Sequence, residues 1–291
     1  MNNIKLATSI RVETVFKLRV SDKDGNITYE SPEFKNIVLN QGLERLGVSG
    51  VEAYCRVGSG SSTPAAEQAQ LDQQVASTSQ ITERNNGVNV ARGYNYISRK
   101  YRFETGVAAG NLTEVGVGWG ASGATLYNRA MIRDTSNMPT TVTVLADEVL
   151  DIFVELRSYV PLTTSRVSAN ISGVDYEIYF KPLVTSKSNA FSSAYVCNSA
   201  TGYSGIIQES NTYPSGSSDN FGITNSNYVP GSLEKTFSVY WGLNSGNAAP
   251  LQTVVIETPY STYQAQFSPT IPKTAETVLK LSFKIGWGRY E

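Results

Sequence analysis

The chain of 291 residues contains 24 Lys+Arg, 25 Asp+Glu and no histidine, and its formal net charge is -1. The lack of imidazole excludes Ser-His-Asp and Cys-His catalysis and every histidine-ligated metal site. Two cysteines, Cys55 and Cys197, are too few for a four-cysteine zinc site or a disulfide framework. We therefore expect no metal and no cofactor. The near-zero charge gives no field that would attract nucleic acid or an anionic membrane.

Charged residues make up 17% of the chain, against roughly 25% in an average soluble protein. Gly (24) and Tyr (17) are abundant instead. This composition is typical of β-rich surfaces that make extensive contacts, because Tyr packs its ring and still offers a hydroxyl group. A β protein with long polar loops would have the same composition. The N-terminal residues lack the apolar core of a signal peptide and no stretch could span a membrane, so we expect synthesis in the cytoplasm.

The first predicted element is a hairpin. Residues 12–20 alternate between apolar and polar side chains, and a turn centred on Asp24-Gly25 leads to a second strand at 27–29. The acidic residues of this turn have the spacing of a calcium-binding loop. However, Ile27 stands where such a loop requires glycine, and no helices flank the segment, so we favour a plain turn.

Two short helices are expected after the hairpin. One covers 41–46 and ends at Gly47, and the other covers 64–75, with Thr63 as its N-cap. The glycine-rich segment 116–120 is not followed by a helix, so we interpret it as a hairpin and not as a phosphate-binding loop. Strands are predicted at 96–105, 112–119, 126–133, 140–145 and 149–159.

Short strings in the first half of the chain recur in the same order in the second half. The pairs are 12–20 with 174–180, 53–55 with 194–197, 100–103 with 234–237, and 139–156 with 272–285. Short β strings also match by chance, but four matches in order favour duplication. We therefore predict an all-β fold of two tandem β-sandwich domains from an internal duplication, with one or two short helices in the first. The domains are 1–160 and 170–291, the linker is 161–169, and residues 185–232 form long Ser/Asn/Tyr/Gly loops of the second copy.

No arrangement of residues predicts catalysis. A glycosidase needs only two carboxylates, but no pair is predicted to face across a cleft, so we expect no enzymatic activity and no catalytic residues. The basic and aromatic residues of 92–102 could bind single-stranded nucleic acid, but we favour a polar strand face, and no nucleic-acid partner is expected. The carboxylates considered are Glu104, Glu114, Asp134, Asp147, Glu148, Asp151 and Glu155.

Several strings resemble those of tailed-bacteriophage virion proteins. They lie at 34–43, 56–64, 112–119, 126–130 and 139–148. Together they are similar to minor tail and tail-fibre-like proteins over roughly residues 10–160. The resemblance implies a non-enzymatic structural role in the virion tail, as a baseplate, tail-tip or fibre-attachment adaptor that is made in the host cytoplasm and assembles with other tail proteins. It brings no catalytic residues.

The duplication adds an expectation about assembly. A trimer of a two-copy chain would present six similar domains to a six-fold tail ring, so we predict a homo-oligomer and favour a trimer with a pseudo-six-fold arrangement. The alternatives are a receptor-binding tail-fibre module that recognises the host surface and a head-decoration protein. In the receptor-binding case, the candidate interaction residues are exposed aromatics of the second copy: Tyr203, Tyr213, Phe221 and Tyr228.

Overall fold

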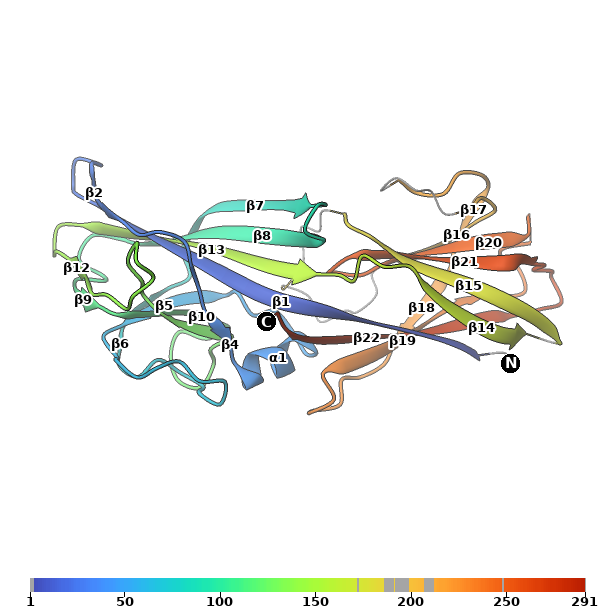
Figure 1. Cartoon of the computed structure of the whole chain (residues 1–291), viewed down its shortest axis with the longest axis horizontal. Helices are drawn as coiled ribbons and strands as arrows, with labels where there is room; N and C mark the ends of the chain where they lie inside the picture. The colour runs from blue at the N-terminus through green and yellow to red at the C-terminus, as the bar shows by residue number, and fades with distance from the viewer. Residues whose placement is uncertain are drawn as a thin grey trace.

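The protein is nearly all β, as predicted. The computed structural model describes residues 3–171, 173–185, 191, 199–206, 212–247 and 249–290. Strands make up 55% of the residues and helix 3%, in several sheets with a sandwich-like arrangement. The molecule is elongated, with its two halves end to end (Figure 1). No helix among the described residues has the length and apolar character needed to cross a membrane.

The first half of the chain contains most of the strands and one short helix. Its elements are β1 (Asn3–Ser21), β2 (Ile27–Glu30), β3 (Phe34–Lys35), β4 (Ile37–Val38), α1 (Asn40–Leu46), β5 (Tyr54–Gly58), β6 (Gln74–Thr78), β7 (Ile81–Asn89), β8 (Tyr94–Phe103), β9 (Gly110–Leu112), β10 (Glu114–Gly118), β11 (Asn128–Met131), β12 (Val142–Val144) and β13 (Val149–Tyr159). The second half contains β14 (Ser165–Ile171), β15 (Val174–Leu183), β16 (Ser199–Tyr203), β17 (Ser218–Asn220), β18 (Gly222–Asn225), β19 (Glu234–Trp241), β20 (Leu251–Glu257), β21 (Thr262–Ile271) and β22 (Leu279–Arg289).

One large sheet contains strands of both halves. Its order is β18-β19-β22-β1-β13-β8-β7, and β2 and β3 also pair with β1. A five-stranded sheet, β4-β11-β10-β5-β6, belongs to the first half, and a six-stranded sheet, β14-β15-β21-β20-β16-β17, to the second. The short pair β12-β9 completes the first half. Apolar side chains from all three large sheets form one continuous core cluster.

Strand β1 connects the two halves. Residues 3–12 pair in parallel with β22, and residues 11–21 pair antiparallel with β13. Its nineteen residues span about 60 Å at roughly 3.3 Å per residue. Ile10, Phe16 and Leu18 are fully buried, because alternate side chains of a strand point to the same face of the sheet. Residues 3–12, which belong to the predicted first domain, therefore supply a strand to the second half.

The strand orders of the two halves correspond. The run β11-β10-β5-β6 has the same order and antiparallel pairing as β21-β20-β16-β17, and β13-β8-β7 matches β22-β19-β18. Two of the repeated strings occupy equivalent strands, in β8 with β19 and in β13 with β22. The string at 174–180 differs, because β15 lies in the six-stranded sheet and β1 takes the place beside β22. The sequence duplication itself stays a prediction, as does the 161–169 boundary.

The structure differs from the sequence-based elements in two segments. Helix α1 forms where 41–46 was predicted, but the predicted helix 64–75 is wrong: this segment is irregular and leads into β6. Leu71 is its one strongly apolar buried residue, so a helix there would have no apolar stripe to bury. The segment 185–232, expected as loops, includes β16, β17 and β18 among its described residues; residues 186–190, 192–198 and 207–211 lie outside them.

Hydrogen bonds join the two halves, both at α1 and between β13 and the turn before β21. The Trp287 indole N–H donates to the carbonyl of Leu43 at 2.8 Å, and the Tyr228 hydroxyl donates to Glu44 Oε2 at 2.8 Å. The carbonyl of Tyr260 accepts a hydrogen bond from Ser158 Oγ at 3.1 Å. With the shared strand β1, these contacts make the molecule one rod-like body.

Candidate functional site

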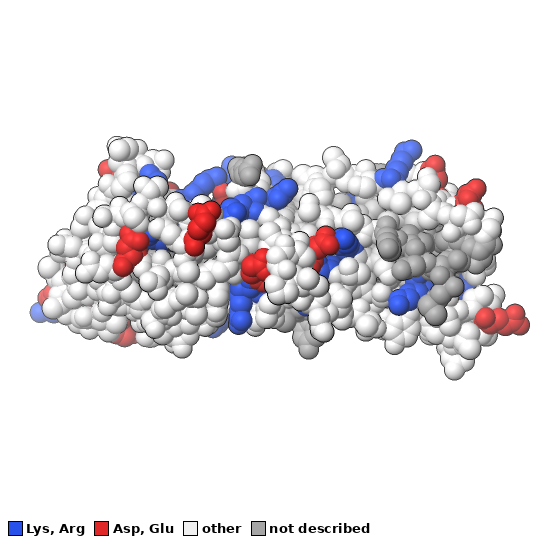
Figure 2. Space-filling model, turned by 90° about the horizontal axis from the view of Figure 1, so that it is seen from below, with Lys and Arg blue, Asp and Glu red and all other residues white. Residues whose placement is uncertain are grey.

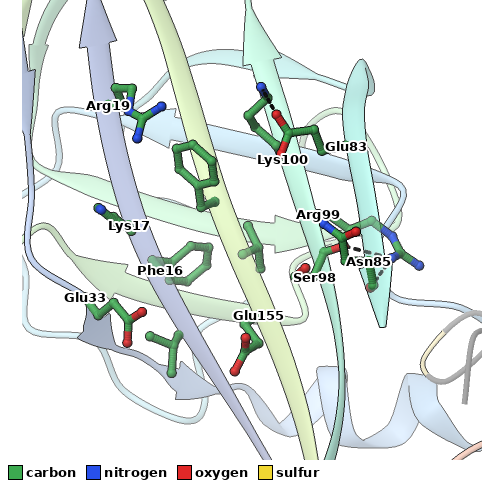
Figure 3. Close-up of a pocket in the computed structure, with 13 residues that line it drawn as sticks. Phe16, Lys17, Arg19, Glu33, Glu83, Asn85, Ser98, Arg99, Lys100 and Glu155 are labelled. Atoms are coloured by element: carbon green, nitrogen blue, oxygen red, sulfur yellow. Dashed lines mark hydrogen bonds and ion pairs between the residues drawn. The ribbon is translucent and has the colours of Figure 1, made fainter. Parts of the chain in front are cut away.

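A hollow lies on the outer face of the large sheet in the first half (Figure 3). Its volume is about 230 Å³, and its floor is built by β1, β13, β8 and β7. Lys17, Phe153 and Lys100 stand opposite one another on three adjacent strands, so their side chains point to the same face. The segment that joins β2 to β3 contributes Glu33 at one side of the hollow.

Phe153 is held between two cations. Arg19 Cζ lies 5.1 Å and Lys100 Nζ 6.0 Å from the centroid of its ring, distances at which a cation is attracted to the aromatic face. Glu30 in turn binds Lys17 at 2.9 Å and Arg19 at 2.8 Å, and these two cations lower the pKa of the Glu30 carboxyl group. Lys100 pairs with Glu83. The aromatic side chain and its flanking cations therefore have a fixed arrangement.

Three other polar side chains of the hollow have no partner within the described part of the chain. The Glu33 carboxylate, the Ser98 hydroxyl and the Asn85 side-chain amide form no hydrogen bond or ion pair there. Glu155 binds Arg157 through Oε1, at 2.7 Å. These groups lie along one concave surface, with Glu33 beside β1 at one side of it and Asn85 on β7 at the other (Figure 3).

Buried polar groups on β10 and β11 hold the chain in place and do not line the hollow. Glu114 and Arg129 are fully buried and form an ion pair at 2.8 Å, and Glu114 also accepts backbone N–H groups of Gly60, Asp72 and Gln73. Arg129 also binds Asp72 at 2.8 Å. This network fixes the irregular segment before β6, and it explains why that segment is not helical.

The remaining carboxylates considered from the sequence are dispersed. Asp151 forms a two-point ion pair with Arg102, with both distances 2.8 Å. Glu148 accepts from the Thr28 hydroxyl at 2.7 Å, and Glu104 accepts from Gln80 at 2.7 Å. Asp134 accepts backbone N–H groups of its own turn, whereas Asp147 lies in an exposed turn. Of the seven, the hollow includes Glu155 alone.

The basic and aromatic residues of β8 are divided between the two faces of the strand. Arg99 and Tyr101 point inward, where Arg99 pairs with Glu52 at 2.9 Å. Burial raises the pKa of Glu52, although Arg99 acts in the opposite direction. Lys100 and Arg102 point outward and are ion-paired. The segment therefore presents no continuous basic strip.

The structure separates the four candidate interaction aromatics. Tyr203 and Tyr213 lie near Glu257, and Tyr213 donates to it at 2.5 Å. Phe221 is 7% exposed and stacks on Trp241 with ring centroids 4.1 Å apart, so it belongs to the core and not to an exposed loop. Tyr228 packs on Trp287 between the halves. They form no single surface. Cys55 is buried and forms no disulfide, whereas Cys197 lies outside the described residues.

Both ends of the rod expose aliphatic side chains. At the first tip they lie in the β1-β2 hairpin and in the turns after β8, β11 and β12: Ile27, Val107, Met138 and Leu145 are 49–60% exposed. At the second tip, Val174 in the β14-β15 hairpin, Leu243 after β19 and Val278 before β22 are 45–48% exposed. Figure 2 shows that much of the face in view carries no charged side chain. The two ends thus offer apolar contact surface at opposite ends of one body.

Sequence reasoning missed the hollow, although one signal was present. Phe153 is the apolar residue on the otherwise charged face of strand 149–159, between Asp151 and Glu155. Among the described residues, no cluster of His, Cys, Asp or Glu could hold a metal ion. Protein-family models, curated proteins and solved structures all fail to match this chain.

Proposed function

We propose that the protein is a non-enzymatic structural component of a bacteriophage tail, acting as a baseplate, tail-tip or fibre-attachment adaptor. The proposal rests on the resemblance of five strings in the first half to tail proteins, and on the shape of the molecule. It places the chain in the virion after synthesis in the host cytoplasm. Its partners are other tail proteins and further copies of itself.

The observation that carries the proposal is the sharing of β1 by both halves. A single strand of about 60 Å lies in one sheet with β22 and β13 and prevents the halves from hinging freely. The two tips, with their exposed aliphatic side chains, are thereby held at a constant separation. A rigid body with an apolar contact surface at each end is suited to joining two parts of an assembly.

The expected pseudo-six-fold arrangement requires correction. Strand β13 runs antiparallel to β1 and β22 runs parallel to it, so these equivalent strands point in opposite directions. A rotation by a sixth of a turn cannot reverse a strand, so the two halves are not related as neighbours in a six-fold ring. A homo-oligomer remains part of the proposal. Native mass spectrometry of the purified chain tests the trimer, which a stable monomer or a ring of six chains would contradict.

Incorporation of tip variants into phage particles tests the adaptor function. In the double variant Met138→Glu/Leu145→Glu, charge replaces two exposed apolar side chains of the first tip, and we expect this variant to fold but to be absent from purified particles. Val229→Glu, at a position that is 64% exposed and away from the tips, is the matched control and should be incorporated normally. Normal incorporation of the double variant would contradict the proposed tip contact.

A further inference from the structure

We infer that the free edge of β14 pairs with the same edge of a second copy of this chain, so that the six-stranded sheet continues across a two-fold axis. Strand β14 ends that sheet on the β15 side (Figure 1). Among the described residues, no strand pairs with its other side. An edge of this kind presents a row of N–H and C=O groups to which another strand can bind. The inference goes beyond the adaptor function, because it concerns the side of the second half and not the tips.

Three residues of β14 direct their backbone groups to the free edge. Ile171 and Val174 face each other across the turn of the β14-β15 hairpin, with two residues between them. Opposite residues of an antiparallel pair alternate between hydrogen-bonded and non-hydrogen-bonded pairs, and the pair that closes a two-residue turn is hydrogen-bonded. The N–H and C=O groups of Arg166, Ser168 and Asn170 therefore point away from β15. Within the described chain, no other segment binds these backbone groups.

The edge of β14 lacks the features that keep exposed edges apart. Its seven residues pair with β15 in one unbroken register, and they include no proline, no lysine and a single charged residue. The longer edge strand β7 has a register shift between Ile81 and Glu83. Such a bulge twists an edge away from a partner. The edge strands β4, β6, β17 and β18 have five residues or fewer. Of these edges, β14 is therefore the best suited to strand pairing.

The second strand is that of another copy, because β14 is complementary to itself in one antiparallel register. With the two-fold axis at Ser168, Val167 of each copy lies opposite Ala169 of the other, and Arg166 lies opposite Asn170. Val167 and Ala169 are partly buried and pack against the core cluster. Directly opposite side chains on one face of a sheet contact each other. The pairing therefore continues the apolar face of the sheet from one copy into the next.

Charges on the outer face favour the same register. Arg166 lies over the ring of Tyr179, with Cζ 4.9 Å from the centroid, and has no carboxylate partner among the described residues. Asp175 stands opposite Asn170 and accepts its side-chain N–H at 2.6 Å, but no described cation pairs with it. In the proposed register, Arg166 of one copy and Asp175 of the other are two strand spacings apart, about 10 Å between Cα atoms. The two side chains can bridge this distance, so each pairing of copies gains two contacts of opposite charge.

A contact about a two-fold axis joins chains in pairs. Alone, the β14 contact gives a dimer. If the chain also forms the proposed trimer through another surface, two trimers meet through their β14 edges. Disruption of the edge halves the mass of the assembly in both cases. The mass of the unaltered protein therefore tests the β14 contact, whereas the halved mass, one chain or three, reports on the trimer separately.

Sedimentation velocity of the full chain over a range of concentrations measures the association. Ser168→Pro removes an N–H group that β15 does not use, and Arg166→Glu places like charges across the axis. Each should weaken association by about tenfold or more and halve the mass. The double variant Arg166→Glu/Asp175→Arg restores opposite charges and should recover association. Ser168→Thr, which keeps the N–H group, and Arg92→Glu in an exposed turn are the matched controls and should associate like the unaltered chain.

A cysteine at the axis tests the register. In a Cys197→Ser background, Ser168→Cys should form a disulfide between two chains on mild oxidation, because opposite residues of a hydrogen-bonded pair lie about 5.5 Å apart at Cα. Ser165→Cys is exposed on the same strand but lies opposite residue 171 of the second copy, so it should form no such disulfide. Non-reducing gel electrophoresis separates the linked chains from the single ones.

Three results would overturn the inference: an unaltered protein with an odd number of chains, association that survives both Ser168→Pro and Arg166→Glu, or equal cross-linking of Ser165→Cys and Ser168→Cys. Thermal melting of each variant establishes that it is folded. If Ser168→Pro does not fold, Arg166→Glu and its charge-reversed double variant still decide the outcome, since both change exposed side chains alone.

Discussion

Single residues show how this chain tolerates charge in its interior. The ion pair of Glu114 and Arg129 has no solvent contact. Glu114 also accepts hydrogen bonds from backbone N–H groups of the segment before β6. A buried ion pair contributes little net stability compared with apolar residues, but the loss of one partner leaves a buried charge without compensation. The intact pair of Glu114 and Arg129 therefore adds little net stability and fixes the path of the chain before β6, whereas removal of either partner should be strongly destabilising.

Glu114→Gln should lower the free energy of unfolding by about 3 kcal/mol, because Arg129 would keep only Asp72 as an anionic partner. Urea denaturation measures the change. The control is Glu234→Gln, which breaks the exposed pair with Lys284 and should cost no more than about 1 kcal/mol. Equal effects of the two substitutions would show that the Glu114 network is not needed for stability.

Tyr228 gives the contact between the halves a dependence on alkaline pH. Burial, with the hydrogen bond to Glu44 as a second cause, raises the pKa of Tyr228 to about 12 from its usual 10. A group with a raised pKa in the folded state stabilises the fold fully below its unfolded pKa, and this contribution is lost as the pH rises through its folded pKa. The stability difference between the wild type and Tyr228→Phe should therefore be constant below pH 10 and shrink between about pH 10 and 12. Urea denaturation at a series of pH values would contradict this if the difference did not change.

At the scale of elements, strands were easier to predict than the segments that join them. The alternation in 149–159 predicted β13 at its observed bounds, because apolar side chains at every second position indicate a half-buried strand. The helix at 64–75 was predicted only from the helix propensity of its residues and from Thr63 as a possible N-cap. The backbone N–H groups of Asp72 and Gln73 donate hydrogen bonds to Glu114, and these override that propensity. No local pattern reveals a partner about forty residues away.

The hairpin between β10 and β11 depends on glycine for close backbone approach. A Cβ atom added at Gly118 would lie 2.0 Å from the carbonyl oxygen of Thr125, whereas one at Gly242 meets nothing within 4 Å. We expect Gly118→Ala to lower the free energy of unfolding by about 1–3 kcal/mol and Gly242→Ala to change it by less than about 0.5 kcal/mol. Chemical denaturation of the two variants is a direct comparison, and a neutral Gly118→Ala would contradict the observed hairpin geometry.

At the scale of the whole molecule, the sequence predicted an all-β protein but not how its halves are joined. Leu6 and Ile10 continue the alternation of the first predicted strand, so the greater length of β1 was visible in the pattern. The parallel pairing of β1 with β22 was not visible in the sequence, because pairing between distant strands leaves no local signal. Asn3 and its partner Lys280 are 277 residues apart. The hollow had one signal, Phe153 on a charged face, but its walls come from strands whose order the sequence does not encode locally.

We propose that this rod is a fixed part of a phage tail. Gold-labelled antibodies against the chain, viewed by negative-stain electron microscopy on purified phage particles, test this proposal. We expect label at the tail, concentrated at the baseplate, tip or fibre-attachment region. Label confined to the head, or intact particles that carry no label, would contradict it.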